Sequence, residues 1–192
     1  MTLKQKKWFF KILTVAGLLV LGGSFILAGC SSDPNKLNPA ITGPQVIVNP
    51  DSIRLGVAKL TGMDIVFEGS GFQPDDSVFI TLVGADKTEI AIADGQVKSD
   101  GTFKATVGPL AKVTGILRAG IIGTYADDGK YNQILVITQA PIPTGVYTAR
   151  GTSMLSDKKA ETKLTVSDPS KIDLLKDWLG KKMGKIQDKR VK

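Results

Sequence analysis

The sequence predicts an all-β domain, folded as an antiparallel sandwich or barrel. From Gln45 onward, short apolar or alternating runs follow one another, and alternation with a period of two is typical of a strand with one buried face. Turn residues separate the runs, whose centres lie about 8–16 residues apart. Because no helical periodicity lies inside this region, the pattern does not fit a parallel sheet built from strand–helix–strand units.

Ten runs have the length and composition of strands. They are Gln45–Asn49, Ile53–Val57, Asp64–Glu68, Ser77–Val83, Glu89–Ala93, Phe103–Val107, Ile116–Tyr125, Ile134–Thr138, Val146–Ala149 and Glu161–Val166. Asp-Gly pairs predict hairpin turns, because the second position of such a turn favours a positive φ angle. These pairs are Asp94-Gly95, Asp100-Gly101 and Asp128-Gly129.

Positive charge is concentrated at the two ends of the chain. The 192 residues include 25 lysines and arginines and 18 acidic residues, yet residues 30–170 hold 13 basic and 15 acidic residues. The pI of about 9.4 therefore does not describe the body of the chain, which argues against a nucleic-acid-binding surface there. The chain has no histidine and one cysteine, Cys30. This excludes intrachain disulfides, histidine-based triads, and zinc or haem sites made of cysteine and histidine.

The N-terminus has the organisation of a secretory signal. Residues 2–11 contain four lysines and no acidic residue, and residues 12–29 contain no charged residue. A basic start before an apolar stretch of 18 residues predicts either a signal peptide or a short transmembrane helix. The four residues at the end of the stretch favour the signal peptide.

Those residues, Leu27-Ala28-Gly29-Cys30, resemble the lipobox of bacterial lipoproteins. The resemblance implies cleavage between Gly29 and Cys30, attachment of a diacylglyceryl group to the Cys30 thiol, and acylation of the new amino group. Two or three acyl chains anchor a protein stably, whereas a single chain binds a bilayer only marginally. The alternative is a free cysteine after an uncleaved helix. The next residue is Ser31 rather than Asp, which by the same resemblance favours the outer membrane in a Gram-negative cell.

The mature chain divides into three segments after the signal peptide, residues 1–29. Residues 30–44 contain three prolines and little that could pack, so they are the expected lipidated tether. Residues 45–167 form the predicted β domain. Residues 168–192 form a predicted basic amphipathic helix.

Several motifs of the β domain resemble bacterial Ig-like domains. They are the segment 69–80 (GSGFQPDDSVFI), the hairpin 97–107 (VKSDGTFKATV), and the closing strands 143–149 (PTGVYTA) and 161–166 (ETKLTV). The resemblance implies an Ig-like β-sandwich, in which we expect Phe72 and Phe103 to be core residues. The segment Leu110–Ala140 is longer than the corresponding link in that family, so it predicts either an extra hairpin or a binding element.

The C-terminal tail begins with a helix signal. Ser170 and Asp173 have the spacing of a capping box, in which each side chain binds the backbone amide of the other residue. An apolar stripe about a quarter of the helical wheel wide is formed by Ile172, Leu175, Leu179, Met183 and Ile186. Two glycines in the tail each weaken the helix by about 1 kcal/mol, so it needs a surface to pack against. That surface is an anionic membrane, a partner protein, or the β domain itself.

The sequence nominates no catalytic residue, metal site or cofactor. It lacks the glycine-rich nucleotide-binding motifs, the HExxH metalloprotease motif and the GxSxG nucleophile motif. Residues 156–159 (SDKK) satisfy S-x-x-K, but the companion motifs of that enzyme class are missing, and a turn between two strands is predicted instead. The pairs Asp75-Asp76 and Asp127-Asp128 lack the spacing of a calcium loop and are better explained as Asx turns.

These patterns together predict a lipid-anchored, non-catalytic lipoprotein of the bacterial cell envelope. Its Ig-like domain serves as a binding or structural module, with membrane lipid as a partner through acylated Cys30 and an envelope protein as another. An alternative is an accessory subunit of a larger envelope assembly that docks through its C-terminal helix. A carbohydrate-binding or hydrolytic lipoprotein fits less well, because Trp8 and Trp178 are the only tryptophans and Trp8 lies in the signal peptide.

Overall fold

The computed structural model describes residues 34–85, 87–125, 129 and 131–190. They belong to one compact unit that begins at Pro34. The predicted signal peptide, the predicted cleavage site at Gly29 and Cys30, Ser31, and the pair Asp127-Asp128 lie outside the described residues. Within the described part, no helix has the length and apolar character needed to cross a bilayer.

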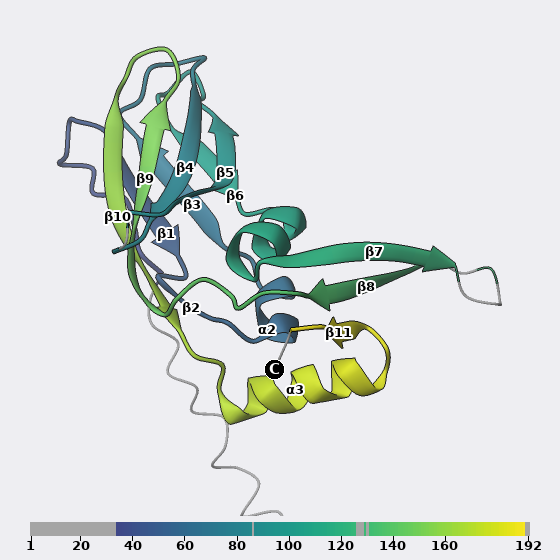
Figure 1. Ribbon diagram of the computed structural model, residues 1–192. Helices are drawn as coiled ribbons and strands as arrows, with labels where there is room; N and C mark the ends of the chain where they lie inside the picture. The colour runs from purple at the N-terminus through teal and green to yellow at the C-terminus, as the bar shows by residue number, and fades with distance from the viewer. Residues whose placement is uncertain (1–33, 86, 126–128, 130, 191–192) are drawn as a thin grey trace, which may run out of the picture. The chain divides into compact units, whose positions relative to one another are not determined.

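The domain is mainly β, as the alternating runs predict, and its strands form three sheets (Figure 1). The first sheet has the order β1-β3-β6, with β1 at Gln45–Asn49, β3 at Val66–Ser70 and β6 at Phe103–Thr106. The second has the order β2-β10-β9-β4-β5. Its strands are β2 (Ser52–Arg54), β4 (Ser77–Val83), β5 (Glu89–Gln96), β9 (Gly145–Ser153) and β10 (Lys159–Ser167). In this sheet β2 runs parallel to β10, and the other neighbours are antiparallel.

The first two sheets share one apolar core. Phe67 of the first sheet and Ile80 and Leu164 of the second are completely buried. The sheets approach each other closely at Gly151 of β9, where a Cβ atom would lie 3.0 Å from a methyl group of Val46 in β1. Alternation along the strands therefore directs one face of each sheet inward.

Phe72 and Phe103 are core residues, as predicted. Each is 3% exposed, and their rings meet edge to face with centroids 5.2 Å apart. Gly69 makes room for this contact, because a Cβ at that position would collide with the Phe103 ring. Gly71 has a φ angle of 80°, in the left-handed region that glycine adopts without strain. The two glycines of this motif thus have different tasks, one in packing and one in turning the chain.

The segment Leu110–Ala140 contains an extra hairpin. It begins with a π-helix, η1 (Ala111–Ile116), and continues with β7 (Ala119–Tyr125) and β8 (Tyr131–Ile137), which pair antiparallel. The C-terminal strand β11 (Ile186–Asp188) adds parallel to β8 and completes the third sheet. Figure 1 shows this hairpin extending away from the other two sheets.

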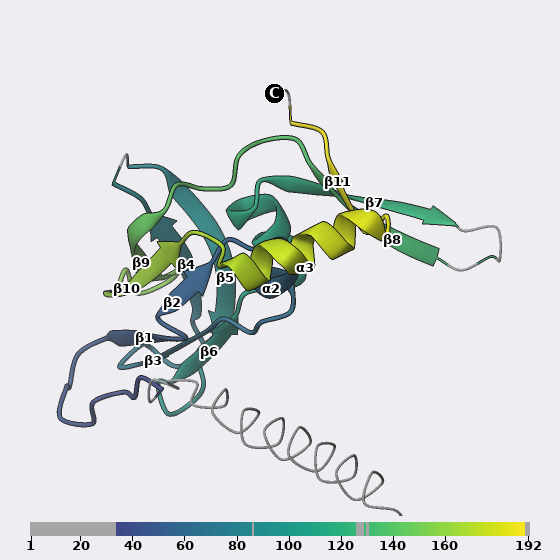
Figure 2. The same cartoon turned by 90° about the horizontal axis from the view of Figure 1, so that it is seen from below.

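The tail contains a helix, α3 (Lys171–Lys182), that is shorter than the predicted segment 168–192. The predicted capping box is present, since the Asp173 amide donates to Ser170 Oγ at 3.2 Å and the Ser170 amide donates to Asp173 Oδ2 at 2.9 Å. The prediction that Ile186 continues the helical stripe is wrong, because Gly184 turns the chain with a φ of 71° and Ile186 begins β11. Figure 2 shows α3 beside the short helix α2 (Val57–Thr61), with which it is in contact.

Two further predictions are wrong in detail. Asp94-Gly95 lies inside β5 rather than in a turn, whereas Asp100-Gly101 forms the turn before β6, with Gly101 at a φ of 76°. The run Ile53–Val57 is not one strand, because β2 ends at Arg54 and the chain enters α2 at Val57. Tertiary contacts override local preference at such short runs.

Candidate binding groove beside helix α3

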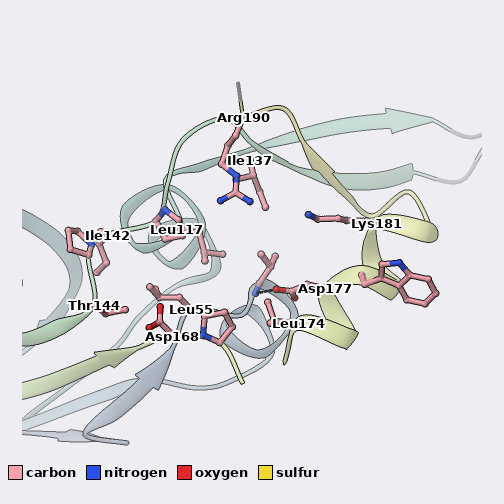
Figure 3. A pocket seen from close by; sticks show the side chains of 15 residues that line it. Leu55, Leu117, Ile137, Ile142, Thr144, Asp168, Leu174, Asp177, Lys181 and Arg190 are labelled. Carbon is pink, nitrogen blue, oxygen red and sulfur yellow. Dashed lines mark hydrogen bonds between the residues drawn. The ribbon is translucent and has the colours of Figure 1, made fainter. Parts of the chain in front are cut away.

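A groove of about 490 Å³ lies between α3 and the segment that joins β8 to β9 (Figure 3). Its floor is apolar, and Leu55, Leu117 and Ile142 contribute side chains that are almost completely buried. Leu174 and Trp178 of α3 form the opposite wall and are about half exposed. An apolar concavity with a few polar groups at its rim is the usual form of a ligand-binding site.

The wall opposite α3 is formed by the segment Pro141-Ile142-Pro143, which two hydrogen bonds hold in place. Pro141 and Pro143 have no amide hydrogen to donate, so Ile142 supplies the only donor of the three, and its amide binds the carbonyl of Ile116 at 3.0 Å. The Tyr147 hydroxyl donates to the carbonyl of Pro143 at 2.8 Å. These two hydrogen bonds hold the segment in place, so the groove is largely preformed.

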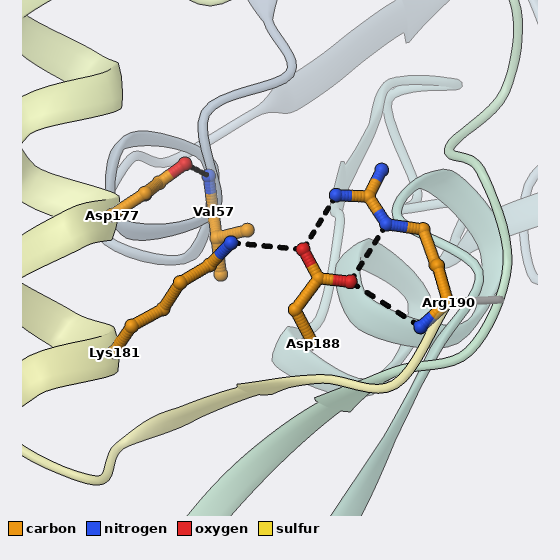
Figure 4. A network of polar contacts seen from close by, with 5 residues as sticks. All are labelled: Val57, Asp177, Lys181, Asp188 and Arg190. Carbon is orange, nitrogen blue, oxygen red and sulfur yellow. Dashed lines mark hydrogen bonds and ion pairs between the residues drawn. The ribbon is translucent and has the colours of Figure 1, made fainter. Parts of the chain in front are cut away.

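Helix α3 is attached through carboxylates rather than through its apolar stripe. Asp177 Oδ2 accepts a hydrogen bond from the Val57 amide at 2.9 Å (Figure 4), and Asp177 Oδ1 accepts one from the Ala58 amide at 2.8 Å. These are the first amides of α2, which have no partner within the helix. Asp173 is 4% exposed and lies 3.5 Å from Arg54 Nε. The hydrogen bonds from Ser170 lower the pKa of Asp173, although its burial opposes the shift.

A three-residue ion network forms the polar rim of the groove. Asp188 accepts from Arg190 Nε at 2.8 Å and Nη2 at 2.6 Å, and from Lys181 Nζ at 2.8 Å (Figure 4). The Arg190 and Lys181 hydrogen bonds hold the pKa of Asp188 well below its usual range, and Asp188 in turn raises the pKa of Arg190. Two cations meet one carboxylate here, so the network has a net charge of +1. It joins the end of α3 to the strand β11.

A second cavity, of about 360 Å³, lies on the other flank of α3. Gly180, Met183 and Ile186 line it from the tail, and Ile121 and Leu135 from the β7–β8 hairpin. A Cβ at Gly180 would lie 2.6 Å from the Ile186 side chain. The glycine that weakens the helix is therefore what lets β11 pack against α3.

The acidic pair Asp75-Asp76 has a structural role at the other end of the domain. Asp76 is fully buried and accepts hydrogen bonds from the amides of Ser77, Leu155 and Ser156 at 2.7, 3.0 and 3.2 Å, and from the hydroxyl of Ser153. Burial raises the pKa of Asp76, but the Ser153 hydroxyl and these amides outweigh it and lower the pKa to about 2. Asp76 thereby joins the start of β4 to the turn between β9 and β10.

The S-x-x-K stretch lies in that same turn, as predicted. The Ser156 hydroxyl donates to Asp76, and Lys158 Nζ donates to the carbonyl of Gly71 at 2.9 Å. The lysine of the motif, Lys159, is exposed and is the first residue of β10. Ser156 therefore serves the turn. Among the described residues, no three histidine, cysteine or acidic side chains are grouped closely enough to hold a metal ion.

The groove was not predicted from the sequence. Its residues come from segments that follow β2, η1, β8, β10 and β11, so no local motif contains them. Two signals point toward it, which are the Pro141-Ile142-Pro143 segment and the spacing of Asp177 and Lys181 on one helix face. The site residues that were predicted, Gly29 and Cys30, lie outside the described residues. No model of a known protein family matches the chain, and no curated protein sequence matches it.

Proposed function

We propose that this protein is a lipid-anchored, non-catalytic lipoprotein of the bacterial cell envelope, whose domain binds an envelope protein through the groove beside α3. The observation that carries the anchor is the complete lipobox Leu27-Ala28-Gly29-Cys30 after a basic and then apolar N-terminus. In a cell with two membranes, Ser31 favours the outer one. No cofactor enters this proposal.

We further propose that the domain is an Ig-like sandwich. In the Ig arrangement, strands G, F and C are neighbours in one sheet, and variable-type domains add C′ beside C. The order β10-β9-β4-β5 agrees with G-F-C-C′, and β1-β3-β6 agrees with A-B-E. The Tyr147 hydroxyl also donates to the carbonyl four residues upstream near the start of β9, as in the tyrosine corner at the start of strand F.

This assignment gives the groove a location within the Ig scheme. The insertion that contains η1, β7 and β8 falls between strands E and F, and the tail follows strand G. The groove forms where these two additions meet. Its apolar floor favours an apolar peptide segment, and the cations at its rim, Lys181 and Arg190, are already paired with Asp188.

The anchor is tested by the intact mass of the mature protein. We expect a chain that starts at Cys30 and carries two or three acyl chains, and that partitions with membranes. The variant Cys30→Ser removes the only thiol and should leave an unacylated chain, whereas Ser32→Ala, two residues away, should be processed normally. An unacylated wild-type chain would refute the anchor.

The groove is tested by site-specific crosslinking in cells that produce the lipidated protein. Acylation blocks Cys30, so Thr144→Cys at the groove rim provides the only free thiol for a photoactivatable crosslinker. We expect one discrete adduct from Thr144→Cys and none from Asp157→Cys in the β9–β10 turn. Equal adducts from both positions would contradict a binding site in the groove.

A further inference from the structure

Helix α3 presents its apolar side chains to solvent. The residues that face the domain are Asp173 and Gly180, which are buried, and Asp177, which binds the amides of α2. Five large apolar side chains away from these contacts are between 44 and 68% exposed, and they are Ile172, Leu175, Trp178, Leu179 and Met183. Trp178 and Met183 lie at the edges of this face, since Trp178 also lines the groove and Met183 the second cavity. An amphipathic helix of a globular domain normally packs in the opposite sense. Exposed apolar side chains gathered on one element mark an interaction surface.

Lysines share this outer face. At about 100° per residue, Lys171 and Lys182 lie between Trp178 and Leu175 on the helical wheel. The Lys182 ammonium lies 5.8 Å from the centre of the Trp178 ring. A long lysine stem can pack along apolar surface while its ammonium group reaches a polar layer. Tryptophan is enriched at the interface between the hydrocarbon and the headgroups of a bilayer.

The charge of this face is not compensated by nearby acids. Residues 171–192 hold eight basic and three acidic residues. Asp173 and Asp177 contact Arg54 and the amides of α2, and Asp188 pairs with Lys181 and Arg190. Within the described part of the chain, Lys171, Lys176 and Lys182 make no ion pair. The outer face of α3 is therefore positive and apolar together, which complements an anionic lipid surface and disfavours contact with a second copy of the same positive face.

The length of the tether favours the membrane as the occupant. Asn35 is held against the end of β1, since its amide donates to Asn49 Oδ1 at 2.7 Å and its side chain donates to the carbonyl of Val48 at 3.0 Å. Only four residues lie between Cys30 and Asn35, and the five residue steps span at most about 18 Å. The strand that follows β1 leads to Arg54, which pairs with Asp173 of α3. An acylated Cys30 would thus hold the Asn35 end of the domain within about 18 Å of the bilayer.

We propose that the outer face of α3, formed by Ile172, Leu175, Trp178, Leu179, Met183, Lys171 and Lys182, lies on the surface of an anionic bilayer and orients the lipid-anchored domain. This inference rests on the proposed lipid anchor for the proximity of the membrane. The apolar side chains enter the level of the headgroups, and the lysines bind lipid phosphates. The protein then has two membrane contacts, the acyl chains and α3.

The sequence provides an internal probe for this contact. Trp178 is the only tryptophan of the mature chain, residues 30–192. We would reconstitute the lipidated protein into vesicles of phosphatidylcholine alone or with phosphatidylglycerol, each with a nitroxide quencher at headgroup depth. In the anionic vesicles we expect a blue shift and strong quenching of Trp178, reduced at least about twofold when salt is raised from 0.1 to 1 M, because the screening length falls from about 10 to 3 Å. The variant Trp178→Phe should remove the signal.

A matched pair of variants isolates the face. Leu175→Asp should abolish the quenching of Trp178, whereas Leu155→Asp should leave it unchanged. Leu155 lies in the β9–β10 turn and is 72% exposed, against 57% for Leu175. Both variants should keep the circular dichroism of the wild type. Equal quenching in neutral and anionic vesicles, or no effect of Leu175→Asp, would overturn the proposal.

Two other outcomes are also decisive. A blue shift in detergent without lipid that grows with protein concentration, together with a dimer in sedimentation, would overturn the proposal in favour of a second copy. If mass spectrometry finds no acyl chain, the anchor fails. The full chain is then added to anionic vesicles that contain the nitroxide quencher, and the signal of Trp178→Phe is subtracted to remove the contribution of Trp8. Quenching of Trp178 in this experiment tests the outer face of α3 independently of the anchor.

Discussion

The two ends of the domain differ in how completely their polar groups and apolar side chains are packed. At the end that holds the β9–β10 turn, the polar groups are bound internally by Asp76, and Phe72 and Phe103 close the core beneath the glycine turn. At the other end lie α2, the β7–β8 hairpin and α3 (Figure 1). Two cavities remain there, and several apolar side chains of α3 are exposed. The first end is built for stability. The second leaves apolar side chains of α3 exposed, and the proposed contacts with other molecules rest on this exposed area.

The largest expected effect is on the stability of the end that holds the β9–β10 turn, which we call the closed end. Phe103→Ala should lower the free energy of unfolding by about 3–5 kcal/mol, because it leaves a cavity beside Phe72. Phe79→Ala is the matched control, since this side chain is 43% exposed, and it should cost less than about 1 kcal/mol. Urea unfolding measures both. Similar losses for the two variants would mean that the Phe72–Phe103 contact does not close the core.

Acid should weaken the closed end next. The pKa of Asp76 is lowered from 3.8 to about 2 in the folded state, so its contribution to stability is complete above about pH 4 and is lost as the pH falls toward 2. Asp76→Asn should destabilise the protein at pH 7 and flatten the decline between pH 4 and 2. Urea unfolding across this range measures the slope. An unchanged slope in the variant would assign the acid sensitivity to other carboxylates.

A smaller effect is expected where α3 joins the domain. Asp177→Ala removes the acceptor of two α2 amides and should cost about 1 kcal/mol, the usual value of a lost helix N-cap. Lys176→Ala, its neighbour, should change stability by less than about 0.5 kcal/mol. Hydrogen exchange of the Val57 and Ala58 amides should accelerate in Asp177→Ala alone. Unchanged protection would mean that α3 is held by other contacts.

The smallest expected effect is on the outer face of α3. Leu175→Asp should change the free energy of unfolding by less than about 0.5 kcal/mol, because the side chain is exposed and packs against little. The same variant should abolish the quenching of Trp178 in anionic vesicles. A loss of several kcal/mol would show that Leu175 supports the fold, and the contrast between the two ends would then be lost.

Local patterns predicted most of the strands correctly. Period-two alternation identified β1, β4, β6 and β10, and Asp100-Gly101 marked the turn before β6, since both depend only on neighbours in the chain. The failures occur where a distant segment decides. Asp94-Gly95 stays inside β5 because β4 continues to pair with it, with Phe79 opposite Asp94 and Val78 opposite Gly95. A turn propensity cannot compete with a formed ladder.

The tail shows most clearly which features could be predicted from the sequence and which are set by tertiary contacts. The capping box at Ser170 and Asp173 could be read from the sequence, because it involves a single helical turn. The predicted apolar stripe is present on α3, but the sequence does not show whether it faces the domain or the solvent. Asp173 and Asp177 find Arg54 and the amides of α2, so the polar side of α3 turns inward. Gly180 admits Ile186, which converts the end of the predicted helix into β11.

The sequence by itself determined the β character of the domain and the residues that close its core, and its resemblance to a lipobox is the basis of the proposed anchor. These depend on the periodicity of side chains, on backbone preferences of glycine, and on short contiguous motifs. Only the tertiary structure decided where the groove lies and which face of α3 is exposed. Both depend on contacts between residues more than a hundred positions apart, such as Asp177 with Val57, and no local free-energy preference encodes which of many such contacts forms.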